Sequence, residues 1–170
     1  MKKILIVITA LVLLSGLSMA YLEAADTINW MYEIETAQQL AREHNKDLLV
    51  LAKTDWDELS NELLKGPLSD NAVIQLSEGF ICLQVSVLDK DFIKRYDITQ
   101  YPTVLFLSSA GNDFAEIERI SGLQEAAVYI AKMKDILVNK NTLLSLKERA
   151  AAENIVKLSR EEQIKTLRSL

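Results

Sequence analysis

The residues best placed to do chemistry lie in the stretch Thr54-Asp55-Trp56-Asp57-Glu58-Leu59-Ser60, which joins an apolar run to an amphipathic segment. Asp57 stands where a helix should begin, and a carboxylate there accepts hydrogen bonds from free backbone N–H groups. We therefore interpret Asp57 first as a structural cap and second as a group in direct contact with a ligand. Asp55 with Glu58 forms a competing capping pattern, so the sequence leaves the identity of the cap open.

Two other reactive residue types occur once each. His44 lies at a predicted helix end, where we interpret it as a cap or a packed ring rather than as a catalytic base. Cys82 lies on a predicted strand, and we interpret it as a buried small apolar residue that has no partner for an internal disulfide. The sequence has no His/Cys cluster, Gly-rich phosphate loop or Gly-x-Ser-x-Gly motif. We accordingly expect no metal site and no cofactor.

The elements that must position these residues follow from the hydrophobic periodicity. Strands are predicted at residues 28–32, 48–52, 80–87, 103–108 and 114–121, and helices at 35–44, 57–65, 71–77, 91–96 and 124–138. The continuous apolar run 48–52 is typical of a strand buried on both faces. Strands and helices alternate, and the last two strands form a predicted hairpin. This order predicts an α/β protein, a three-layer α/β/α sandwich with a mixed central sheet and a C-terminal helical extension.

The first 20 of the 170 residues have the layout of a secretory signal peptide. Lys2 and Lys3 precede an apolar core, and Ser18-Met19-Ala20 is a small-x-small cleavage site. We expect an exported protein, periplasmic or extracellular, with residues 1–20 as the signal peptide, 21–138 as the folded domain and 139–170 as the helical extension. Because the apolar core is shorter than the ~20 residues of a membrane span, we expect no stable span after cleavage. An uncleaved N-terminal membrane anchor is the alternative.

Charge is divided unevenly between the domain and its extension. Residues 21–138 carry 10 Lys and Arg against 20 Asp and Glu, a net charge of −10, whereas residues 139–170 carry 7 against 4, a net charge of +3. The acidic domain argues against nucleic acid as a partner. The basic extension is predicted as two helices, the second starting at a capping box formed by Ser159 and Glu162. It could dock on its own domain, on a partner or on an anionic membrane surface.

The order of the elements, the tryptophan that ends the second strand and the stretch Tyr101-Pro102-Thr103 together resemble the thioredoxin-like superfamily. The resemblance covers about residues 27–138 and includes Gly122, which follows the last strand. It is closest to exported members that carry Ser/Thr-Asp-Trp-Cys-x-x-Cys after the second strand. In this chain Asp57 and Ser60 occupy the two cysteine positions. The resemblance implies a thioredoxin-like fold with a cis peptide bond before the proline.

The departures from the family pattern concern catalysis. In the family, the first cysteine attacks a disulfide as a thiolate and the second resolves the mixed disulfide. The carboxylate of Asp57 and the hydroxyl of Ser60 cannot perform these steps. Leu51 stands where many members bury an acidic proton relay. The resemblance therefore implies a degenerate active site, and we expect a redox-inactive protein that is not an enzyme.

One function of the family needs no cysteine. In relatives, the backbone just before the cis-proline pairs with a substrate peptide as an added strand. We therefore predict a peptide- or protein-binding or chaperone-like module, with a groove formed by Trp56, Asp57, Tyr101 and Pro102. In the simplest alternative Trp56 and Tyr101 only cover the sheet edge. Two further alternatives are thiol chemistry retained through Cys82 or a partner's cysteines, and a structural subunit whose extension forms the interface. The oligomeric state stays open.

Overall fold

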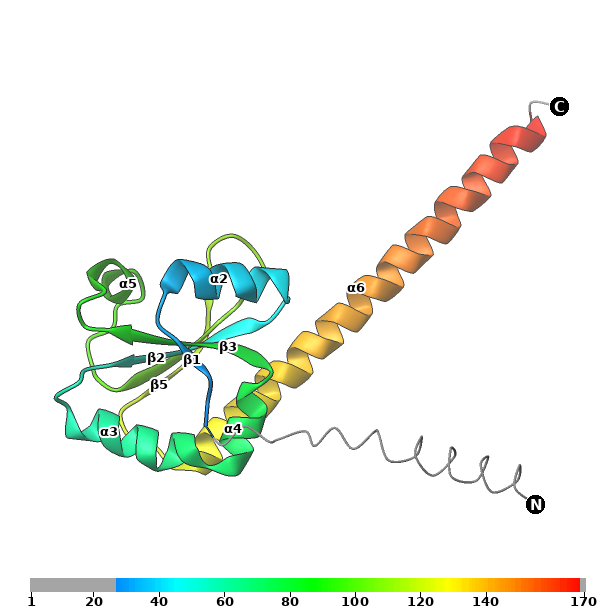
Figure 1. The fold of residues 1–170 in the computed structure, drawn as a ribbon. Coiled ribbons are helices and arrows are strands. Elements are labelled where there is room, and N and C mark those ends of the chain that lie inside the picture. The colour runs from blue at the N-terminus through cyan, green and yellow to red at the C-terminus, as the bar shows by residue number, and fades with distance from the viewer. Residues whose placement is uncertain (1–26, 169–170) are drawn as a thin grey trace, which may run out of the picture.

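A computed structural model describes residues 27–168 (Figure 1), so the predicted signal peptide lies outside the described part of the chain. The elements are β1 (Trp30–Met31), α2 (Ile34–Glu43), β2 (Asp47–Lys53), α3 (Glu58–Lys65), a short 3-10 turn η1 (Pro67–Ser69), α4 (Asn71–Ser77), β3 (Phe80–Ser86), α5 (Lys90–Arg95), β4 (Thr103–Leu107), β5 (Glu116–Ser121) and α6 (Ala126–Arg168). Apart from η1, this is the predicted order up to α6. Apart from the end of α6, the bounds of these elements differ from the predicted ones by at most two residues.

The five strands form one mixed sheet in the order β1-β3-β2-β4-β5. Strands β1, β3 and β2 are parallel, whereas β4 is antiparallel to β2 and β5 is antiparallel to β4, so the predicted hairpin is confirmed. Ala52 pairs with Thr103, which in turn pairs with Ser121. This register brings the end of β2, the start of β4 and the end of β5 together at the same end of the sheet.

Helices cover both faces of the sheet (Figure 1). Because successive side chains of a strand point to opposite faces, Leu49 and Leu51 of β2 pack in the core with α3, α4 and α6. Leu48 and Val50 pack in the second core, with α2 and α5. All four side chains are at most 1% exposed. The three-layer architecture and the burial of this strand on both faces are therefore confirmed.

Helix α6 corrects the prediction for the C-terminal extension. Instead of a helix ending at residue 138 and two further helices, the structure has one helix of 43 residues, Ala126–Arg168. The predicted start at Ser159 and Glu162 falls inside this helix. The sequence has no glycine or proline after Gly122 to interrupt it. The pattern of a capping box is compatible with a helix interior, so it could not by itself locate a helix start.

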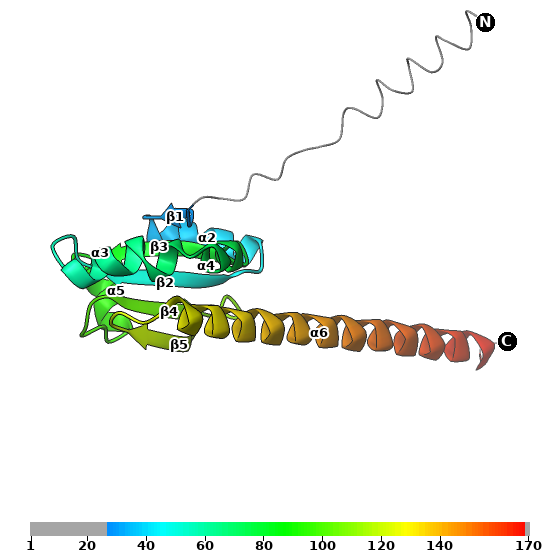
Figure 2. The same cartoon turned by 90° about the horizontal axis from the view of Figure 1, so that it is seen from below.

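The first part of α6 is packed against the body, and the rest projects away from it (Figure 2). Tyr129 and Met133 are fully buried and Ile136 is 7% exposed. One turn later, Lys140 Nζ lies 2.6 Å from the carboxylate of Asp47 at the start of β2. Beyond this contact the helix does not fold back on its own body. Nowhere in residues 27–168 is a helix both long and apolar enough to span a bilayer.

Candidate functional site

Asp57 and Ser60 lie where β2 runs into α3, and their side chains bond to each other. The Asp57 carboxylate accepts hydrogen bonds from the Ser60 backbone N–H at 2.9 Å and from the Ser60 hydroxyl at 2.7 Å. The interpretation of Asp57 as the cap of this helix is therefore confirmed. Asp55 instead pairs with Lys53 at 2.5 Å. Ser60 is fully buried, so its hydroxyl is not available to a ligand.

The predicted groove residues come together at this junction. A shallow hollow is lined by Thr54, Trp56, Asp57, Glu58 and Tyr101. Trp56 is 76% exposed, the largest exposed aromatic side chain on this part of the surface. Tyr101 is half-buried, and burial raises the pKa of its hydroxyl. Pro102 is buried beside it rather than lining the hollow, and the peptide bond between the two is cis, as the resemblance implies.

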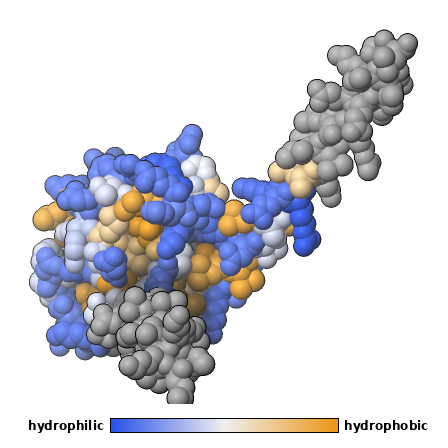
Figure 3. Space-filling view, turned by 45° about the vertical axis from the view of Figure 1, so that its right-hand side comes forward, coloured by the Kyte–Doolittle hydropathy of each residue, from blue (hydrophilic) through white to orange (hydrophobic). Residues whose placement is uncertain are grey.

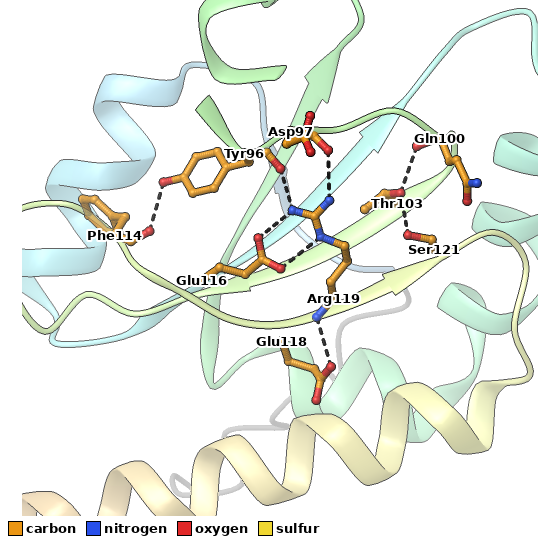
Figure 4. Close-up of polar contacts among 9 residues, drawn as sticks. All are labelled: Tyr96, Asp97, Gln100, Thr103, Phe114, Glu116, Glu118, Arg119 and Ser121. Carbon is orange, nitrogen blue, oxygen red and sulfur yellow. Dashed lines mark hydrogen bonds and ion pairs between the residues drawn. The ribbon is translucent and has the colours of Figure 1, made fainter. Parts of the chain in front are cut away.

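The backbone around Pro102 is held on both sides but left unpaired at Tyr101. The carbonyl of Pro102 accepts a hydrogen bond from the N–H of Gly122 at 2.8 Å. The Thr103 hydroxyl is 2.9 Å from the carbonyl of Gln100 and 3.2 Å from the hydroxyl of Ser121 (Figure 4). Within residues 27–168, neither the N–H nor the C=O of Tyr101 has a backbone partner. An extended chain could therefore pair with both groups.

A polar cluster fixes the segment that leads into this loop (Figure 4). The guanidinium of Arg119 on β5 donates to the carbonyls of Tyr96 at 2.5 Å and Asp97 at 3.1 Å. It also pairs with Glu116 at 2.6 Å, and this bond raises the pKa of Arg119. Sequence reasoning missed this role, because a single arginine on a half-exposed strand gives no signal of a contact made to a loop more than 20 residues away.

Thr54 adds a polar group beneath the hollow. Its side chain is 7% exposed, and its hydroxyl has no hydrogen-bond partner among the described residues. A buried hydroxyl without a partner costs free energy, of the order of 1–3 kcal/mol. The Thr54 hydroxyl is therefore an unsatisfied polar group buried beneath the hollow.

No family model and no curated protein matches this sequence. Solved structures do match. A thioredoxin from Thermus thermophilus superposes with a TM-score of 0.61 and 24% identity, over 67% of this chain and 90% of that one. A DsbH oxidoreductase superposes with a TM-score of 0.58 and 15% identity, over 71% of this chain and 92% of that one. The C-terminal domain of Neisseria meningitidis DsbD, in its oxidised form, superposes with a TM-score of 0.51 and 20% identity, over 59% of this chain and 90% of that one. The chain has the thioredoxin-like fold.

The one cysteine of the sequence, Cys82, lies away from Asp57 and Ser60. Cys82 is on β3, next to Leu49 in the middle of β2, and it is 5% exposed. Its Sγ lies 3.6 Å from the carbonyl of Ser77, and burial raises its pKa to about 12. The thiol is therefore protonated at neutral pH and shielded from solvent. The interpretation of Cys82 as a buried small apolar residue is confirmed.

Two other residues considered for a functional role, His44 and Leu51, have structural roles instead. His44 caps the C-terminal end of α2 and is exposed, at the opposite end of β2 from Asp57. Leu51, at the place of the family's acidic relay, is fully buried in the apolar core. In the part of the chain that the structure describes, no group of three or more His, Cys, Asp and Glu side chains could hold a metal ion.

Proposed function

We propose that this protein is an exported, redox-inactive thioredoxin-like module that binds extended segments of peptides or proteins. The observation that carries the proposal is the unpaired backbone of Tyr101 beside the exposed ring of Trp56. A segment that adds as a strand would gain main-chain hydrogen bonds from Tyr101. Trp56 offers a large apolar surface that loses its contact with water on binding.

The charges around the hollow favour a particular class of segment. Asp57 and Glu58 line the hollow beside Trp56, no basic residue of the described chain lines it, and the neighbouring Asp55 is already paired with Lys53. Complementary charge steers association and suppresses wrong partners. We therefore propose that neutral or basic segments bind better than acidic ones.

The absence of redox activity is proposed because no residue at the site can exchange thiols. The side chains at positions 57 and 60 are hydrogen-bonded to each other, and the pKa of Cys82 is raised to about 12 by burial. We expect the mature protein not to accelerate the reduction of insulin by dithiothreitol. Acceleration that disappears in Cys82→Ser would instead support the alternative in which thiol chemistry is retained.

Peptide binding is tested with a permanently unfolded polypeptide whose cysteines are reduced and capped with neutral carboxamidomethyl groups. Its affinity for the mature protein is measured by fluorescence anisotropy. We expect Trp56→Ala to raise the dissociation constant at least about tenfold, which corresponds to ~1.4 kcal/mol. Tyr32→Ala is the matched control, because this tyrosine is 69% exposed and does not line the hollow. Equal weakening by both variants, or by neither, would contradict the proposal.

Export is part of the proposal and rests on the signal-like pattern of residues 1–20. Expression of the full sequence followed by N-terminal sequencing of the released protein tests it. We expect the mature chain to begin at Tyr21. A protein that keeps Met1 and stays with the membrane fraction would support the uncleaved anchor instead.

A further inference from the structure

A second hollow, called here the hollow on α6, lies where this helix leaves the body, at the opposite end of β2 from Trp56. Its floor is apolar and is formed by Ile117 of β5 and by Ile136, Leu143 and Leu144 of α6. Ile117 is 44% exposed and Leu143 is 59% exposed, so much of this apolar surface is in contact with water. Figure 3 shows apolar side chains gathered at this base of the helix. Because apolar surface in contact with water is unfavourable, the hollow on α6 is suited to binding an apolar group.

The size of the hollow on α6 limits the apolar group that it can hold. It encloses about 220 Å³. An apolar cavity of about 150 Å³ in another protein holds one benzene molecule, which has six carbon atoms. By proportion, the hollow on α6 has room for an apolar group of about nine carbon atoms. This is the size of a medium-length alkyl chain and is much smaller than a protein segment or a whole phospholipid.

The charged residues that line the hollow on α6 are Asp47, Lys140 and Lys147, so its lining carries a net charge of +1. Lys140 Nζ lies 2.6 Å from the Asp47 carboxylate and 2.9 Å from the Ser109 hydroxyl, which accounts for two of its three N–H groups. Lys147 lies two helical turns further on, on the same side of α6, and no ion pair among the described side chains involves it. The hollow on α6 therefore combines an apolar floor with a local positive charge.

The charge of the lining decides between the possible head groups of such a ligand. A cationic head group would lie beside two ammonium groups, and a neutral head group would leave Lys147 without a counter-charge. A carboxylate, in contrast, accepts charge-assisted hydrogen bonds from ammonium groups. We propose that the hollow on α6 binds one medium-chain fatty acid, with its alkyl chain on the apolar floor and its carboxylate paired with Lys147 and Lys140. This site is independent of the proposed peptide binding.

The choice of head group is tested with decanoate, decan-1-ol and decyltrimethylammonium, which have alkyl chains of similar length and an anionic, a neutral and a cationic head group. Isothermal titration calorimetry measures their dissociation constants for the full mature chain, at low salt and below the micelle-forming concentration of each compound. We expect one decanoate per chain, with a dissociation constant at least about tenfold lower than that of decyltrimethylammonium, or ~1.4 kcal/mol, and decan-1-ol between them. Non-specific adsorption would give the opposite order, because residues 21–138 have a net charge of −10.

Two exposed leucines of α6 provide matched variants for the location of the site. Leu143→Asp places a carboxylate on the floor of the hollow on α6, and we expect it to raise the dissociation constant of decanoate at least about tenfold. Leu146→Asp is the control, because this leucine is similarly exposed, at 53%, but does not line the hollow. We expect it to change the constant by less than about twofold. Lys147→Gln should weaken decanoate at least about threefold and decan-1-ol by less than about twofold, since only the anion pairs with the ammonium group.

The proposal is overturned if decyltrimethylammonium binds as tightly as decanoate, if Leu143→Asp and Leu146→Asp have equal effects, or if decanoate shows no saturable binding below its micelle-forming concentration. A chain that fails to bind decanoate but binds anionic phospholipid vesicles would overturn it in favour of a membrane surface. Trp56→Ala should leave the dissociation constant of decanoate unchanged while it weakens the binding of the unfolded polypeptide. The outcome for the fatty acid is therefore separable from the outcome for peptide binding.

Discussion

At the scale of single residues, the side chains of Asp57 and Ser60 are hydrogen-bonded to each other. The Asp57 carboxylate accepts two hydrogen bonds from Ser60, one from its backbone and one from its hydroxyl. The start of a helix stabilises negative charge, whether it is a thiolate or a carboxylate. Replacement of a cysteine by aspartate thus keeps the electrostatic preference of the position while removing its reactivity.

Removal of this cap has a predictable cost. We expect Asp57→Ala to lower the free energy of unfolding by about 1–2 kcal/mol, the usual cost of losing an N-cap, whereas Asp57→Asn should keep most of it because asparagine also caps. Urea denaturation measures both. Asp55→Ala is the control, since the exposed Asp55 carboxylate only pairs with Lys53, and it should change stability by less than about 1 kcal/mol. A larger loss in Asp55→Ala would mean that the cap has been assigned to the wrong residue.

Cys82 should be silent toward thiol reagents while the protein is folded. Burial raises its pKa to about 12, so the thiolate fraction is very small at neutral pH and grows only as the pH approaches that value. We expect Ellman's reagent to label Cys82 slowly at neutral pH and rapidly once denaturant unfolds the chain. Equal rates in the two conditions would show that the thiol is accessible, which would reopen the thiol-chemistry alternative.

At the scale of elements, the junction of β2 and α3 keeps a geometry that suits two cysteines. The carboxylate of Asp57 and the hydroxyl of Ser60 are 2.7 Å apart, so the two side chains point toward each other. We expect the double variant Asp57→Cys, Ser60→Cys to form an internal disulfide under oxidising conditions, which requires Cα atoms within about 7 Å. Thiol counting in denaturant should then find only Cys82 free. A variant that stays fully reduced would contradict this geometry.

Helix α6 depends on one buried ion pair for its attachment to the start of β2. The side chains of Asp47 and Lys140 are 6% and 16% exposed, and Ser109 also donates to Asp47 through its backbone N–H and its hydroxyl. Lys140→Ala leaves the buried carboxylate without its cation. We expect a loss of about 3 kcal/mol, at the low end for breaking a buried pair because the bonds from Ser109 remain.

Thermal or urea unfolding of Lys140→Ala measures this loss. Lys134→Ala provides the control, because Lys134 is exposed on the same helix and should change the stability by less than about 0.5 kcal/mol. If the two variants unfold alike, α6 is held to the body by its apolar contacts alone.

The elements differ in how far the sequence predicts them. The run Leu48 to Ala52 predicts a doubly buried strand because only such a strand is apolar at every position. The length of α6 could not be predicted from a capping pattern, since the decisive feature is the absence of any glycine or proline after Gly122. The contacts of Arg119 could not be predicted either, because they depend on the sheet register that brings β5 beside the loop after α5.

At the scale of the whole molecule, the hollow beside Trp56 and the attachment of α6 lie at opposite ends of β2. Trp56 follows the end of this strand, whereas Asp47 at its start pairs with Lys140 beside the hollow on α6. The first and last residues of this seven-residue strand are six steps, or about 20 Å, apart. The contacts that attach α6 to the body therefore leave the hollow beside Trp56 open.

The central claim, that an extended chain pairs with the backbone of Tyr101, is tested most directly by amide hydrogen exchange followed by NMR. Tyr101 N–H has no backbone partner in the structure, so it should exchange quickly in the free protein. Addition of saturating carboxamidomethylated unfolded polypeptide should slow the exchange of this amide at least about tenfold and leave Ile117, at the other end of the sheet, unchanged. Binding of the polypeptide without protection of Tyr101 would contradict the account.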